Sequence, residues 1–145
     1  MRTKLTFLFL LFISLTFAQQ AKIDSLVKVI ATAKDTTLVN ALNDIAFRYG
    51  KLGDFENALK HSQQALENAE KIGNRKGMAT AYRNYGVIYK NMADYPKSLE
   101  YHNKALQIST EDKDKKSIAA SLNNIANIYY LQSDFAKALD IHFKS

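Results

Sequence analysis

LVNALNDIAFRYGKLGDFENALKHSQQAL, residues 38–66, is the stretch of sequence that decides the fold, because its pattern returns twice. Residues 78–106 read MATAYRNYGVIYKNMADYPKSLEYHNKAL, and residues 118–145 read IAASLNNIANIYYLQSDFAKALDIHFKS. Each block begins 40 residues after the one before it, without a gap. A fixed period of this length indicates a repeat architecture, in which each unit packs against its neighbours.

Small and aromatic residues recur at fixed places in the three blocks and predict two helices per repeat. In block one the apolar residues of the first half are spaced i, i+3, i+4 and i+7, at Leu42, Ile45, Ala46 and Tyr49. This spacing places them on one face of a helix. The recurring small residues are Ala46, Gly86 and Ala126, each followed three positions later by a tyrosine, and then Ala58, Ser98 and Ala138. Small residues let paired helices approach closely, with the tyrosines beside them.

An aspartate separates the two predicted helices of each repeat, at Asp54, Asp94 and Asp134. Its carboxylate can accept hydrogen bonds from the free amides at the start of the second helix. Pro96 falls in the first turn of such a helix, where its missing N–H does no harm. The sequence has this single proline, five glycines and no cysteine. We therefore predict an all-α fold, an α-α superhelix or solenoid stabilised by packing, with no disulfide.

The repeated residues resemble the tetratricopeptide repeat. The resemblance covers residues 38–145 and rests on the small residue, tyrosine and alanine positions. It departs at two positions: the usual tryptophan is replaced by Leu42, Tyr82 and Leu122, and the later aromatic is replaced by Ser62, His102 and His142. The period is also 40 residues instead of 34. These departures match a longer-helix variant of the family. We divide the chain into repeat one (38–77), repeat two (78–117) and repeat three (118–145), the last of which is incomplete at its C-terminal end.

The residues before the repeats suggest export and a cap. A short basic start (Arg2, Lys4) precedes the apolar run 5–17, and Thr16-Phe17-Ala18 offers small residues at the positions that a signal peptidase reads. We expect residues 1–18 to be a signal peptide, an uncleaved anchor or a buried first helix being the alternatives. Residues 19–37 are expected to hold a capping helix, with Ile23, Leu26, Val27 and Ile30 on its apolar side.

A concave binding surface is what the resemblance implies, lined by the first helix of each repeat and suited to extended peptides or helices. The residues opposite the packing stripe are the candidates for contact with a protein or peptide ligand: Asn43, Phe47, Arg83, Val87, Lys90, Asn123, Asn127 and Tyr130. Asparagine amides pair well with a peptide backbone, and Arg83 and Lys90 suit an acidic group. In the chaperone-binding members of the family a lysine and an asparagine four apart hold a terminal carboxylate. Asn43 and Phe47 occupy those places here, which argues against that activity.

Catalytic chemistry has no support in the sequence. His61, His102 and His142 have no cysteine, carboxylate pair or neighbouring histidine spaced to complete a site, so we predict no catalytic residue, no metal and no cofactor. The formal charge of +6 falls to +4 without Arg2 and Lys4, and the basic residues are mixed with acids, as in 111–116. A nucleic-acid partner is therefore not expected.

The function expected from these features is an exported interaction scaffold. A signal peptide, a capping helix and 40-residue repeats together resemble the N-terminal sensory region of Bacteroidetes sensor histidine kinases and related signalling proteins. The resemblance implies a periplasmic module of a longer protein anchored in the inner membrane. A free periplasmic adaptor, or the N-terminal region of a nucleotide cyclase or a transcriptional regulator, is the alternative. Self-association through the repeats also stays open, and contact with the membrane is expected only through the signal peptide or a downstream span.

Overall fold

The computed structural model describes residues 18–144, and every regular element among them is an α-helix. This confirms the predicted all-α class. Residues 18–32 form an N-terminal helix. The helices that follow are α2 (Asp35–Leu52), α3 (Phe55–Lys71), α4 (Arg75–Asn91), α5 (Tyr95–Glu111), α6 (Lys115–Leu131) and α7 (Phe135–Lys144). The first helix of each hairpin begins three residues before the repeat bounds at 38, 78 and 118.

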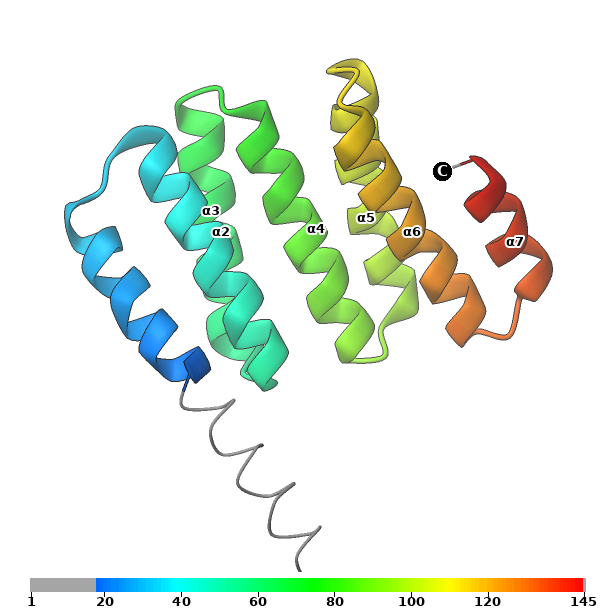
Figure 1. Cartoon of the computed structure of the whole chain (residues 1–145), viewed down its shortest axis with the longest axis horizontal. Coiled ribbons are helices and arrows are strands. Elements are labelled where there is room, and N and C mark those ends of the chain that lie inside the picture. The colour runs from blue at the N-terminus through cyan, green and yellow to red at the C-terminus, as the bar shows by residue number, and fades with distance from the viewer. Residues whose placement is uncertain (1–17, 145) are drawn as a thin grey trace, which may run out of the picture.

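The helices form successive antiparallel hairpins, α2–α3, α4–α5 and α6–α7, that stack in one direction (Figure 1). α2, α4 and α6 make one row, and α3 and α5 lie behind them. α4 contacts α2 and α6 within its row and α3 and α5 in the other, whereas α2 and α6 do not contact each other. This nearest-neighbour arrangement is the predicted solenoid.

Small side chains occupy the interface inside each hairpin, as the repeat predicts. Ala46 and Ala58 are fully buried in the first hairpin, and Gly86 and Ser98 face each other in the second. The hydroxyl of Ser98 donates a hydrogen bond of 2.6 Å to the carbonyl oxygen of Gly86. The tyrosines that follow the small residues are half-buried beside the interface, where Tyr49 stacks on the ring of His61.

Each link from α2 to α7 uses a side-chain cap, whereas Lys34 before α2 provides none. Asp54, Asp94 and Asp134 each accept a hydrogen bond of 3.2 Å from the backbone N–H three residues further on, which confirms the predicted role of the aspartates. Asn74 and Asp114 cap α4 and α6 in the same way. The starts of α3 to α7 therefore each have a side-chain cap, and Pro96 lies in the first turn of α5.

The N-terminal helix packs against the first hairpin. Ile23 and Leu26 are buried against Ala41 and Ile45 of α2. The prediction that Val27 belongs to the same apolar face is wrong, because its side chain is 50% exposed. One residue is about 100° of rotation on a helix, and this turns Val27 out of the narrow contact that Leu26 makes. The apolar run 5–17 lies outside the described residues. Between residues 18 and 144 no helix is long and apolar enough to cross a membrane.

Candidate peptide-binding groove

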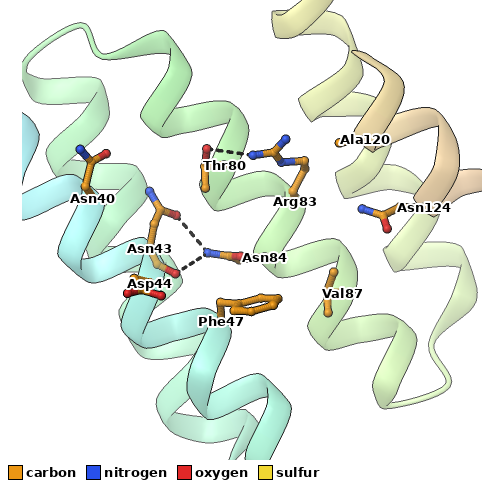
Figure 2. A pocket seen from close by; sticks show the side chains of 10 residues that line it. All are labelled: Asn40, Asn43, Asp44, Phe47, Thr80, Arg83, Asn84, Val87, Ala120 and Asn124. Carbon is orange, nitrogen blue, oxygen red and sulfur yellow. Dashed lines mark hydrogen bonds between the residues drawn. The ribbon is translucent and has the colours of Figure 1, made fainter. Parts of the chain in front are cut away.

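A groove of about 430 Å³ runs over the row formed by α2, α4 and α6. Figure 2 shows the side chains that line it, which come from all three helices. The lining residues are Asn40, Asn43, Asp44, Phe47, Thr80, Arg83, Asn84, Val87, Ala120 and Asn124.

The lining residues occupy the same helical positions in each repeat. On α2 they are spaced i, i+3, i+4 and i+7, and the lining residues of α4 lie 40 residues further on with the same spacing. Ala120 and Asn124 continue the pattern on α6. Such spacing keeps side chains on one helical face, so the stacked hairpins present one continuous surface. The groove is thus a consequence of the same period that builds the core.

Two buried asparagines tie α2 to α4 at the floor of the groove. The side-chain amide of Asn84 donates to the backbone oxygen of Asn43 at 2.9 Å and to its side-chain oxygen at 3.1 Å. The amide of Asn43 in turn donates to the carbonyl oxygen of Gly77 at 3.2 Å. Both residues are only about one-twentieth exposed, at 5% and 6%. Their hydrogen bonds therefore serve the fold and specify the register of the two helices.

The charges in the groove are unevenly balanced. Asp44 forms an ion pair with Arg48 of the same helix, with 3.2 Å between Oδ1 and Nε. Arg83 is half-buried and donates one hydrogen bond, of 3.2 Å, to the hydroxyl of Thr80. Burial lowers the pKa of Arg83 because water is removed from the guanidinium, and the charge of Asp114 acts weakly in the opposite direction. Among residues 18–144, the groove thus contains a cation with no paired acid.

Apolar surface is also available in the groove. Phe47 is 40% exposed, with the Nζ of Lys51 at 4.9 Å from the centre of its ring, and Val87 is half-buried. An exposed aromatic beside amides and a guanidinium is typical of surfaces that bind peptides, since it offers apolar contact while polar groups orient the ligand.

The predicted contact residues are divided between two surfaces. Asn43, Phe47, Arg83 and Val87 line the groove, with Asn43 already engaged in the fold. Asn127 and Tyr130 instead line a second hollow of about 490 Å³ beside α7, together with Phe135, Ala138, Leu139 and His142. Lys90 and Asn123 line neither of the two.

Sequence reasoning missed the groove residues on the outer edge of the same helical faces. These are Asn40, Asp44, Thr80, Asn84, Ala120 and Asn124. Each lies one position after, or three positions before, a predicted contact residue at Asn43, Arg83 or Asn123, so a wider helical face would have included them. No three His, Asp or Glu side chains gather to hold a metal anywhere in the described part of the chain.

The comparisons with known proteins agree with this architecture. The family model described as tetratricopeptide repeat matches residues 37–111 and 77–142. No curated protein matches. Among solved structures, the tetratricopeptide domain of Arabidopsis FLU is similar with a TM-score of 0.66 at 21% identity, over 73% of this chain and 89% of that one. BtubC from P. vanneervenii is similar with a TM-score of 0.68 at 22% identity, over 81% of this chain and 50% of that one. The chain therefore belongs to the tetratricopeptide repeat family, whose members are typically non-enzymatic scaffolds for interactions between proteins.

Proposed function

We propose that this chain is an exported scaffold whose groove binds an extended segment of a partner protein, as the periplasmic sensory module of a membrane-bound signal-transduction protein of the histidine kinase type. The observation that supports binding is the set of groove side chains that the fold leaves accessible. Phe47 on α2 is exposed, and Arg83 on α4 has no acid partner among residues 18–144. Side chains held by a packed scaffold bind with little ordering cost.

The support for export comes from the residues before the repeats. The basic start, the apolar run 5–17 and the small residue Ala18 follow the order of a signal peptide. Pulse expression followed by osmotic shock tests this. We expect the released protein to begin at Gln19, and protein that keeps Met1 in the cytoplasm would contradict export.

Photo-crosslinking tests the groove directly. With benzoyl-phenylalanine at Val87, we expect crosslinks to a partner that disappear when Phe47→Asp is added. The same crosslinker at Gln107, which is exposed on α5 of the other row, is the matched control. Equal crosslinking at both positions, or crosslinks indifferent to Phe47→Asp, would contradict a specific groove.

Phosphorylation in membranes tests the signalling context. Cells that express the intact gene are fractionated, and the membranes are supplied with labelled ATP. We expect autophosphorylation of the gene product that changes when Phe47→Asp replaces the exposed aromatic ring of the groove with a charge. Recovery of all the protein in the soluble periplasmic fraction would instead identify a free adaptor.

A further inference from the structure

The guanidinium of Arg83 lies in the groove without a neutralising partner. Within residues 18–144 no carboxylate oxygen comes within 4.0 Å of it, since every ion pair in this part of the chain involves other residues. Its only hydrogen bond to the described part of the chain goes to the neutral hydroxyl of Thr80. A half-buried cation of this kind loses hydration and gains only the smaller attraction of the Asp114 charge, which disfavours the charged form unless an anion arrives.

The nearby carboxylates are already engaged. Asp44 lines the same groove but binds Arg48. Asp114, whose charge acts on Arg83, accepts hydrogen bonds from the backbone N–H of Ser117 at 3.1 Å and from its hydroxyl at 2.8 Å. These bonds cap α6 and hold the pKa of Asp114 below its usual value. Neither acid can turn to Arg83 without giving up a contact that the fold uses.

The surroundings of Arg83 suit an acidic side chain in the middle of a peptide. Figure 2 shows Arg83 between α4 and α6, with Asn124 on the facing helix and with Val87 and Phe47 further along the groove. Lining residues continue on both sides, toward α2 and toward α6. A bound chain can thus pass Arg83 in either direction, which favours an internal side-chain carboxylate over a chain terminus.

We propose that Arg83 binds the carboxylate of a glutamate or aspartate in the partner segment, while Phe47 and Val87 contact an apolar side chain beside it. This inference rests on the proposed peptide-binding function of the groove. A guanidinium holds a carboxylate through two parallel hydrogen bonds, so the residue contributes orientation as well as attraction. Lys90, which also has no ion pair with residues 18–144, lies seven residues or about 10 Å along the same face of α4. It adds a positive charge beyond the residues that line the groove.

Fluorescence anisotropy with defined peptide pools tests the proposal. The probes are amidated ten-residue peptides with uncharged residues randomised around a central glutamate, and a matched pool with a central glutamine. We expect the glutamate pool to bind about tenfold more tightly at low salt, and the preference to shrink as salt is raised. Arg83→Gln should remove the preference and Arg83→Lys should retain part of it. Arg75→Gln removes an exposed arginine of the same helix and should leave the preference intact.

The other outcomes distinguish failure of peptide binding by the groove from failure of carboxylate binding by Arg83. Equal binding of both pools, lost in Phe47→Asp, contradicts the acidic ligand but leaves the groove. Binding by neither pool contradicts both. A preference for glutamate that survives in Arg83→Gln places the cation elsewhere and overturns the assignment. A third pool has a central glutamine and a free C-terminal carboxylate. Binding by this pool alone would mean that Arg83 holds a chain terminus and would overturn the proposed side-chain carboxylate. Circular dichroism melts establish that each variant is folded.

Discussion

Gly86 and His102 are matched in size across the second hairpin. A Cβ atom at Gly86 would lie 2.6 Å from the imidazole of His102, whose side chain is fully buried. The first hairpin pairs Ala46 with Ser62 at the equivalent positions, and both are fully buried as well. A larger side chain on one helix thus accompanies a smaller one on the other, as close packing requires.

Gly86→Ala is expected to destabilise the protein by about 1–2 kcal/mol, measured by urea unfolding, because the added methyl group would lie 2.6 Å from the fully buried ring of His102. In a His102→Ser background the sign should reverse, since alanine is the better helix former by roughly 0.5–1 kcal/mol. The double variant reproduces the polar and small pair of the first hairpin. A stability change in the double variant equal to the sum of the changes in the two single variants would contradict this coupling.

His102 should also make stability depend on pH. Neither ring nitrogen has a hydrogen-bond partner in the described residues, and burial, with smaller effects from the charges of Lys90 and Arg83, lowers the pKa of His102 to about 4. Because the unfolded chain takes up the proton first, the ionisation of His102 has no effect on stability well above pH 6.5. As pH falls, proton uptake by the unfolded chain lowers the free energy of unfolding, by up to roughly 3 kcal/mol below pH 4. Urea unfolding at pH 7.5 and pH 5 should show a smaller difference in His102→Ser than in the parent. An unchanged difference would mean that the ring is solvated.

The links from α2 to α7 share a left-handed backbone conformation. The residue before each capping side chain has a positive φ: 79° at Gly53, 66° at Gly73, 61° at Ala93, 55° at Lys113 and 62° at Ser133. Glycine adopts this left-handed conformation without strain, whereas a residue with a Cβ does not. The second hairpin therefore turns with some stored strain that the first avoids.

Ala93→Gly is expected to stabilise the protein by about 1 kcal/mol, because it relieves this strain in the α4–α5 link. The greater freedom of glycine in the unfolded chain offsets part of the gain. Thermal unfolding followed by circular dichroism measures the change. Gly53→Ala is the reverse control and should lose a similar amount, and a loss on Ala93→Gly would refute the argument.

Protection from exchange should vary along the whole molecule. α4 contacts α2, α3, α5 and α6, whereas α7 contacts only α6 among the labelled helices. The side chains of Leu139 and Phe143 on α7 are accordingly 58% and 83% exposed. Hydrogen–deuterium exchange followed by mass spectrometry should find α7 exchanging fastest and α4 slowest. Ile23→Ala should speed exchange in α2 more than in α6, and uniform exchange would indicate a single cooperative unit.

The sequence was sufficient for the helices and for the hairpins, because both depend on residues that recur at a fixed spacing. It was less informative wherever a side chain depends on a neighbour from another repeat. Asn43 was predicted to contact a ligand, yet its amide is held by Gly77 and Asn84, residues 34 and 41 positions away. His142 occupies the same register as His102 but is exposed, since α7 contacts only α6 among the labelled helices whereas α5 packs against both α4 and α6. Periodicity identifies equivalent positions, while their burial depends on what lies across the interface.

The absence of contact between α2 and α6 has a mechanical consequence. The angle between the first and third hairpins depends on two interfaces in series, so the stack can bend without opening any one core. A ligand that spans the row would change this curvature, and the displacement would grow with distance from the bend. An event beside Arg83 would in this way become a movement of α7, which lies farthest along the stack among the described helices.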